Sequence, residues 1–219
     1  MRVLAIDLSI ASLAYAKRKS AALGLTGIEY AQADLLHLGE IGRSFDVIEA
    51  SGVLHHLADP FEGWRILLRM LRPGGLMYLG LYSALARQDV TAARAFIASQ
   101  GFTASPEGIR RCRQAMMESG EDTALRRLSH TPDFATMSGC RDLLFHVQEH
   151  HMTLPEIDRF ISAHGLSFLG FDASAAIEQS YRSRFSEDPL MTDLRNWDQF
   201  EHSFPSTFSN MYQFWVKKG

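Results

Sequence analysis

The sequence predicts an α/β fold built on a parallel sheet with helices on both faces, because short apolar runs alternate with helical stretches over residues 1–83. Four runs have the length and composition of buried strands, and polar or small residues follow each of them. These runs are 3–6, 28–31, 45–50 and 76–82. Their order predicts parallel strands joined by crossover helices.

The helical stretches between these runs carry start and stop residues. Ser9 is a suitable N-cap for a helix that ends in the basic residues 17–19. Asp59 and Pro60 open another helix, whose apolar residues recur on one face until the segment 73–75 stops it. These signals support the alternation of strand and helix.

The second half of the chain is predicted to complete the sheet after an insertion. Residues 84–131 are rich in Ala, Arg and Met and are expected to be helical, whereas 133–140 is expected to be loop. A helix at 154–164, with Thr153 as its cap, precedes strands at 166–171 and 211–216. We therefore divide the chain into three parts, which are 1–83, 84–153 and 154–219.

Composition narrows the functional class. The formal net charge is -3 and 46% of the 219 residues are hydrophobic, so a sizeable core is expected and a nucleic-acid footprint, usually basic, is not favoured. The cysteines, Cys112 and Cys140, form no zinc-spaced set and fit a reducing cytoplasm, although a single disulfide stays open. No segment has the roughly 20 apolar residues of a membrane span. The apolar run 3–14 resembles a signal peptide, but Asp7 inside it favours a strand followed by a helix.

Polar residues cluster at the ends of the predicted strands. Asp7, Asp34, Ser51 and Tyr82 each come at or just after such an end. In parallel sheets the carboxyl ends of the strands meet at one edge, where ligands bind. The sequence therefore predicts a binding site at this edge.

Three segments together resemble class I S-adenosylmethionine-dependent methyltransferases. They are VLAIDLS at 3–9, IEYAQADL at 28–35, and FDVIEASGVLHHL at 45–57 followed by LRPGGL at 71–76. The resemblance implies a Rossmann-like methyltransferase sheet with S-adenosyl-L-methionine as cofactor. A further stretch, from Asp142 to Trp215, is similar to methyltransferase modules that bacteria join to helical repeat regions.

The resemblance also assigns roles at the strand ends. Asp7 would accept hydrogen bonds from both ribose hydroxyls, Asp34 would accept from the adenine amino group, and Ser51 would line the methionine end. Each acid also has a structural interpretation, as a helix-start acid for Asp7 and as a turn residue for Asp34. The predicted cofactor-binding residues are Asp7, Leu8, Asp34, Leu35, Ala50 and Ser51.

Histidines supply the candidates for acceptor chemistry. His55 or His56 could serve as general base, with Tyr82 touching the acceptor, although polar contacts alone would also explain them. His146 and His150 are spaced i and i+4, so they could share a metal if that stretch is helical; no further ligand set is evident, and a role in the substrate pocket is preferred. No metal site is predicted.

The family's first strand and its glycine-rich turn would precede Val3. In the family sheet that strand lies between the strands predicted at 3–6 and 45–50. We therefore expect those two strands to pair with each other, or a partner to fill the gap, or the chain to be a piece of a longer product. Association could then use exposed strand edges or an upstream helical repeat region.

The function expected from these observations is methyl transfer by direct displacement to an oxygen, nitrogen or carbon nucleophile, with the insertion 84–153 as a substrate lid. The acceptor, a small molecule or a protein, is not identified. We expect a cytoplasmic protein that works without a membrane. The alternative is a truncated, non-catalytic binding or interaction module, which cofactor binding would distinguish.

Overall fold

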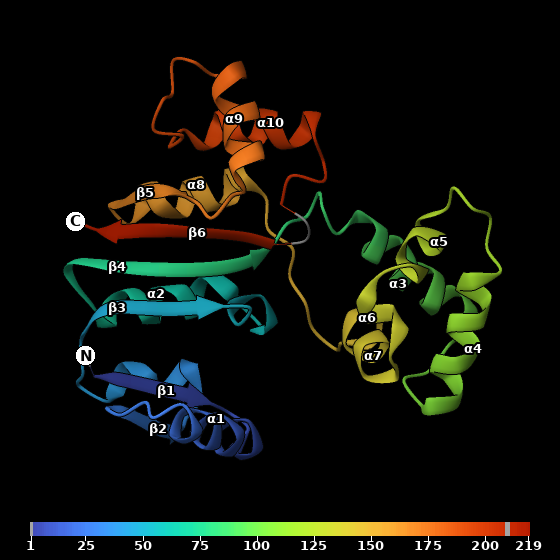
Figure 1. The fold of residues 1–219 in the computed structure, drawn as a ribbon, viewed down its shortest axis with the longest axis horizontal. Helices are drawn as coiled ribbons and strands as arrows, with labels where there is room; N and C mark the ends of the chain where they lie inside the picture. Colours follow the sequence, from blue (N-terminus) through green and yellow to red (C-terminus); the bar gives the residue numbers. More distant parts are fainter. Residues whose placement is uncertain (1, 209–210) are drawn as a thin grey trace.

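The computed structural model describes residues 2–208 and 211–219 and contains a two-stranded and a four-stranded sheet (Figure 1). β1 pairs with β2 in parallel. The larger sheet has the order β3-β4-β6-β5, in which β3 and β4 are parallel and β6 is antiparallel to both of its neighbours. The strands are β1 (Val3–Asp7), β2 (Ile28–Gln32), β3 (Phe45–Ser51), β4 (Leu71–Tyr82), β5 (Leu166–Phe171) and β6 (Met211–Lys218).

The predicted α/β, Rossmann-like fold is confirmed, although helices cover only one face of β3, β4 and β6 among the described residues instead of both faces. Each predicted strand is present within a few residues of its expected bounds. β4 differs most, because it begins at Leu71, which pairs with Phe45, and so includes the Pro-Gly-Gly segment. A register shift between Phe45 and Val47 accommodates those extra residues. β6 reverses direction relative to β4, so the parallel order holds from β1 to β4 and not beyond.

Local signals place the helices that pack on the strands. α1 (Ile10–Ala22) begins at Ser9, whose Oγ accepts from the Ser12 amide at 3.2 Å. α2 (Pro60–Met70) begins at Asp59 in the same way, and the Lys218 ammonium at the end of β6 donates to the carbonyls of Leu68 and Leu71, both at 2.8 Å. That lysine satisfies carbonyls that the last turn of a helix leaves unpaired. It thereby ties α2 to the opposite end of the chain.

The core of the sheet lies on one face. Met77 and Leu79 from β4 and Phe214 from β6 are completely buried there, and Trp64 of α2 stacks on Phe160 at 4.1 Å between ring centres. The covering helices of the second half are α8 (Leu154–Ala163), α9 (Ala175–Arg184) and α10 (Leu194–Ser203). α8 confirms the prediction, with Thr153 and Glu156 forming a capping box. α9 was not predicted, and α10 lies where only a polar, aromatic segment was recognised.

The insertion forms a second helical core. It comprises α3 (Gln88–Gln100), α4 (Pro106–Met117), α5 (Ala124–Ser129), α6 (Pro132–Ala135) and α7 (Met137–Phe145), around buried residues of its own. The prediction of a loop at 133–140 is wrong, because α6 and α7 occupy that segment. Thr136 caps α7, and burial of Phe134 and Cys140 in the helical core stabilises both helices.

In the part of the chain that the structure describes, no ladder joins β1 to β3, so these strands do not pair with each other. Figure 1 shows the two ladders as separate units. Val47 on β3 is 53% exposed and Trp215 on β6 is 36% exposed, and Figure 1 shows this side of β3, β4 and β6 unobstructed, with α2 behind them. Among the described residues, one edge of β1, one edge of β3 and one sheet face are therefore accessible.

Two short 3₁₀ helices lie in the connections, η1 (Leu35–Glu40) between β2 and β3 and η2 (Leu54–His56) between β3 and α2. α2 supports η2 through Gly63, since a Cβ there would overlap the Leu57 side chain and approach that of Leu54 at 3.0 Å. This close approach sets the position of the segment that carries His55 and His56.

We predict that Gly63→Ala destabilises the protein by about 1–3 kcal/mol, the usual cost of overpacking, with the better helix propensity of alanine offsetting part of it. Urea unfolding measures the change. Gly120→Ala is the matched control, because its nearest neighbour, Thr123, would lie at 3.7 Å. Equal stability of the two variants would show that η2 can move away from α2 at little cost.

Candidate functional site

The carboxyl ends of the parallel strands lie on one side of the molecule. In Figure 1 the arrows of β1, β3 and β4 point toward the side on which α3 to α7 lie. Asp7 ends β1, Ser51 ends β3 and Tyr82 ends β4, while Asp34 follows β2, which is parallel to β1. The structure thus places the residues chosen from the strand ends along one edge.

Both acids make local bonds that the structural interpretation predicts. Asp7 Oδ1 accepts from the Ser9 amide at 2.7 Å, and Asp34 Oδ1 accepts from the Leu36 amide at 2.9 Å. Asp7 is exposed and Asp34 is half-buried, so each carboxylate retains acceptor capacity toward solvent.

The other predicted cofactor residues differ in exposure. Leu8 is exposed, whereas Leu35 and Ala50 are buried in the sheet core. The Ser51 hydroxyl lies 3.9 Å from the Met211 sulfur, close to Gly80 of β4. Of this group, Leu8 and Ser51 are therefore the side chains with access to the edge.

The histidines that sequence analysis treated as two groups form one cluster. His55 stacks on Tyr82 with ring centres 3.8 Å apart, His56 lies 4.3 Å from His55, and His56 stacks on His146 at 4.2 Å. The His150 amide donates to the His55 carbonyl at 2.8 Å. Residues from η2, β4 and the segment after α7 therefore meet beyond the ends of β3 and β4.

The segment 146–152 lies beside the end of β4 in space. The Met152 amide donates to the Tyr82 carbonyl at 2.7 Å, and the Ala84 amide donates to the Met152 carbonyl at 2.8 Å. α7 ends at Phe145, so His146 and His150 are not on a helix and their i, i+4 spacing does not bring them to one helical face. Among the described residues no three His, Cys, Asp or Glu side chains gather as metal ligands would.

His55 is a neutral imidazole in a buried position. It has no exposed surface, and neither ring nitrogen makes a hydrogen bond of normal geometry. Burial lowers the pKa of His55 to about 3, and the neighbouring His56 contributes in the same direction, while the nearby Gly80 carbonyl opposes the shift only weakly. His55 therefore packs on Tyr82 without charge.

His56 has a different environment. It is half-buried, and its Nδ1 lies 3.2 Å from the Gln148 carbonyl. Because a carbonyl only accepts, Nδ1 carries the proton in this arrangement and Nε2 is left with its lone pair. Of the two adjacent histidines, His56 is the one with a nitrogen prepared to accept a proton.

A buried ion cluster stands beside these rings and was not predicted. The Glu149 side chain is 1% exposed and accepts from Arg87 at 2.9 Å, Arg94 at 2.9 Å and His151 at 2.7 Å. Burial acts to raise the pKa of Glu149, but the His151 hydrogen bond and the two arginine charges outweigh it and hold that pKa at about 2. The Arg87 guanidinium also lies 3.8 Å from the centre of the Tyr82 ring. Only the position of Arg87 shortly after the end of β4 could have suggested it.

A second buried carboxylate lies on the other side of the end of β4. Glu201 of α10 accepts from the Ser83 hydroxyl at 2.5 Å and from the Tyr212 hydroxyl at 2.7 Å. Burial raises the pKa of Glu201, and the two hydroxyl donors and the nearby His202 do not outweigh it. Nothing in the sequence joins Ser83 to Glu201, since they are far apart along the chain.

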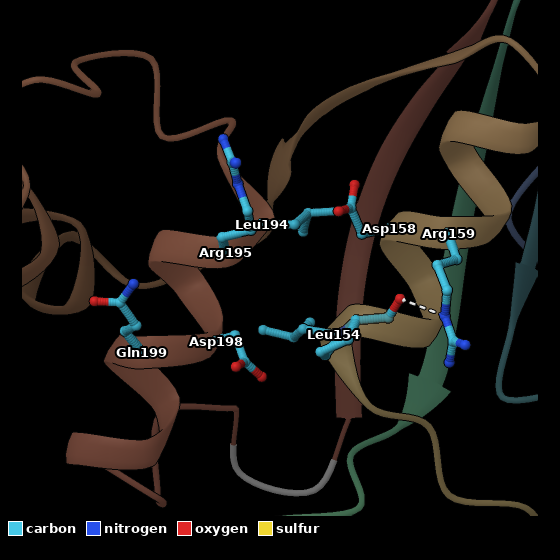
Figure 2. A pocket seen from close by; sticks show the side chains of 8 residues that line it. Leu154, Asp158, Arg159, Leu194, Arg195, Asp198 and Gln199 are labelled. Atoms are coloured by element: carbon cyan, nitrogen blue, oxygen red, sulfur yellow. Dashed lines mark hydrogen bonds between the residues drawn. The ribbon is translucent and has the colours of Figure 1, made fainter.

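Two clefts among the described residues are lined in part by α10, the helix that carries Glu201. One of about 300 Å³ separates α8 from α10, with Leu154 and Leu194 between acidic and basic side chains (Figure 2). It contains none of the predicted site residues. Another of about 200 Å³ is lined by Gln88, Thr153, Glu201 and Tyr212 among others, and so adjoins the end of β4.

We predict that stability falls as the pH is lowered from about 6.5 toward 3, because the unfolded chain protonates His55 near its ordinary pKa of 6.5 and the folded chain only near 3. Over that window, protonation of His55 lowers the free energy of unfolding by at most about 1.4 kcal/mol per pH unit. Urea unfolding between roughly pH 7 and 5 measures the slope, which His55→Leu is expected to reduce. Glu149 contributes little between pH 7 and 5, because its carboxyl group titrates near 4.5 in the unfolded chain and at about 2 in the folded chain, so the stability that it provides is lost only at lower pH.

The control for this measurement is His130→Gln, which changes an exposed histidine of the helical core. Its slope is expected to match that of the unchanged protein. Identical slopes in His55→Leu and the unchanged protein would mean that His55 is not kept neutral by burial.

Comparison with known sequences finds a methyltransferase domain match in the first part of the chain. Residues 1–79 match a family model described as a methyltransferase domain. An uncharacterised protein of Synechococcus is 30% identical over 86% of this chain, which spans 45% of that relative. A ubiquinone biosynthesis O-methyltransferase of Parvibaculum lavamentivorans is 42% identical over 53 residues, which are 24% of this chain and 21% of that enzyme.

Solved structures show the same fold. PKMT2 from Rickettsia typhi covers 98% of this chain with a TM-score of 0.73 at 14% identity, and 43% of that protein is matched. The same protein has been solved in complex with AdoHcy. An S-adenosylmethionine-dependent methyltransferase from Mesorhizobium loti covers 99% of this chain and is itself matched over 80%, with a TM-score of 0.51 at 20% identity. The chain thus spans under half the length of the Synechococcus and Rickettsia proteins.

No helix among the described residues has the length and apolar character needed to cross a bilayer. The methyltransferase-domain match covers residues 1–79, and the solved structures show the same fold over nearly the whole chain. The chain therefore resembles a methyltransferase domain in its first strands and shares the fold of a solved S-adenosylmethionine-dependent methyltransferase.

Proposed function

We propose that this chain binds S-adenosylmethionine at the carboxyl edge of β1 to β4 and supports methyl transfer to a nucleophilic acceptor by direct displacement. The observation that carries the proposal is the position of Asp7, Asp34 and Ser51 at one edge, within the residues that match the methyltransferase domain. The acceptor is a small molecule or a protein with an oxygen, nitrogen or carbon nucleophile.

The residues present fit the adenosine half of the cofactor. Asp7 is exposed and would accept from the ribose hydroxyls, with Leu8 beside it, while Asp34 would accept from the adenine amino group against buried Leu35. Ala50 and Ser51 would line the methionine end. The cofactor would supply an electrophilic methyl group.

The histidine cluster would contact the methyl acceptor and remove its proton. His56 Nε2 would take the proton from the nucleophilic group of the methyl acceptor, because the Nδ1 hydrogen is donated to the Gln148 carbonyl. Tyr82, His146 and His150 would line the acceptor side, and His55 would support the Tyr82 ring rather than exchange protons. Displacement depends mainly on alignment of the two reacting centres, which the helices 88–145 would assist by acting as a lid.

A non-catalytic binding module is the less favoured candidate. It would keep the fold and bind cofactor weakly, without bringing an acceptor to the edge. The cluster of His56, Tyr82 and His146 beyond the strand ends argues for acceptor chemistry instead. Association through the accessible edges of β1 and β3, and a cytoplasmic location, form part of the same proposal.

We predict that Asp7→Ala weakens cofactor binding roughly 10- to 150-fold, which corresponds to the loss of about 1.5–3 kcal/mol for a hydrogen bond to a charged group. Calorimetry measures the dissociation constant, in a version of the protein that carries an added N-terminal strand and glycine turn. Asp46→Ala is the control, since Asp46 is exposed at the opposite end of a strand and pairs with Arg72. An unchanged constant in Asp7→Ala would remove Asp7 from the site.

The free edges of β1 and β3 generate a second prediction. A version extended at its N-terminus by one strand and a glycine turn is expected to melt at a higher temperature than residues 1–219 and to bind cofactor more tightly. A strand inserted between these edges would satisfy both ladders, at the usual spacing of about 4.8 Å. Thermal melts with and without S-adenosylmethionine make the comparison. The prediction is wrong if residues 1–219 alone show the rise in melting temperature that mass action gives for a micromolar site.

A further inference from the structure

We infer that Glu149 is the positioning residue for the acceptor side of the site, and that Arg87 carries its effect to Tyr82. The inference rests on the proposed function, in which Tyr82 contacts the acceptor. It concerns a carboxylate that the proposed mechanism does not otherwise use. The basis is a chain of direct contacts from Glu149 to Arg87 and from Arg87 to the Tyr82 ring.

Glu149 joins three parts of the molecule. Its Oε1 accepts from Arg87, which precedes α3, and from His151 on its own segment. Its Oε2 accepts from Arg94 in α3, and the same Arg94 nitrogen donates to the Leu143 carbonyl of α7 at 3.0 Å. Both carboxylate oxygens are therefore saturated by charged or polar donors in a site that excludes water.

The burial of these groups makes the arrangement rigid. The side chains of Glu149 and Arg87 are 1% and 4% exposed. Removing one partner of a buried ion pair leaves the other charge without compensation, which costs far more than losing a surface pair. In the interactions that the structure describes, Glu149 is the carboxylate that pairs with Arg87. The position of the Arg87 guanidinium therefore depends on Glu149.

Arg87 in turn contacts the ring that the mechanism uses. Its guanidinium carbon lies 3.8 Å from the Tyr82 ring centre, and the His55 ring lies 3.8 Å from the same centre. A cation stacked on an aromatic face is held by the ring's quadrupole, and the interaction strengthens when water is excluded. Fixing Arg87 therefore fixes the orientation of Tyr82 at the end of β4.

The segment that carries Glu149 has no regular secondary structure over residues 146–151. The His150 and Met152 amides donate to the His55 and Tyr82 carbonyls, the Gln148 side chain donates to the Leu57 carbonyl, and His146 stacks on His56. Next to His150, the buried Glu149 side chain adds a charged anchor that joins the segment to Arg87 and Arg94. Removing this charge is therefore expected to change the position of Arg87 and of the Tyr82 ring.

The test observes Tyr82 directly in residues 1–219. Carbon-13 labelled tyrosine gives one ring signal per tyrosine, and Tyr82→Phe assigns the one of interest. Glu149→Gln removes the charge and keeps the shape, while Arg87→Lys keeps the charge and the pairing with Glu149 but removes the planar group over the ring. The Tyr82 signal is expected to shift or broaden in both variants.

Two matched variants separate positioning from general stability. Arg94→Lys disturbs the other arm of the cluster without touching Tyr82, and Glu107→Gln removes an exposed acid of the helical core. Both are expected to leave the Tyr82 signal in place. If Glu149→Gln fails to fold, Arg87→Lys decides the question, because it retains the buried ion pair.

An unchanged Tyr82 signal in Arg87→Lys, or in a folded Glu149→Gln, overturns the inference and leaves Glu149 as a structural ion pair. A shift of equal size in Arg94→Lys also overturns it, since the effect would then spread through the whole cluster. Calorimetry with S-adenosylmethionine on the version extended by a strand and a glycine turn tests the proposed function separately. Absence of cofactor binding by that extended version would refute the proposed function while leaving the Tyr82 result readable.

Discussion

Two backbone hydrogen bonds at the end of β4 fix the position of the helical insertion and of the histidine segment relative to the sheet. The chain leaves the sheet after Tyr82, builds five helices, and returns at Met152, whose amide and carbonyl bond to Tyr82 and Ala84. These bonds hold the two ends of the long inserted segment together. The entropy of closing a loop grows only slowly with its length, so an insertion of this size is tolerated once its ends are fixed. Everything on the acceptor side, from His146 to His151, depends on that closure.

The two buried glutamates near this point show how neighbours decide the state of a carboxylate. Glu149 has two arginines and a histidine around it, and its pKa lies well below the ordinary value although burial opposes the shift. Glu201 accepts hydrogen bonds from the hydroxyls of Ser83 and Tyr212 and pairs with no arginine in the interactions described, and burial raises its pKa. Hydroxyl donors alone therefore do not compensate for lost water, whereas paired cations do. The end of β4 lies between a charged environment and one that favours the neutral acid.

Sequence reasoning succeeded where the signal is local. Ser9, Asp59 and Thr153 each cap the helix that follows them, and β4 shows over residues 76–82 the continuous apolar run of a buried strand. It failed where tertiary packing decides, as in α6 and α7, whose short polar sequences fold around Phe134 and Cys140. It also could not foresee that His146 stacks on His56, because that contact depends on where the chain returns to the sheet. The roles of the predicted site residues stay predictions.

The separation of the two hydrophobic cores has a consequence for how this protein can be observed. The helical core around Ile109, Cys112 and Met116 shares no buried residue with the core of the sheet. The chain has three tryptophans, and Trp64, Trp197 and Trp215 all belong to the sheet part. Tryptophan fluorescence therefore reports only on the sheet, while circular dichroism records helix from both cores. Where the two cores lose structure at different temperatures, the two signals will not coincide, and a single melting temperature then describes neither core.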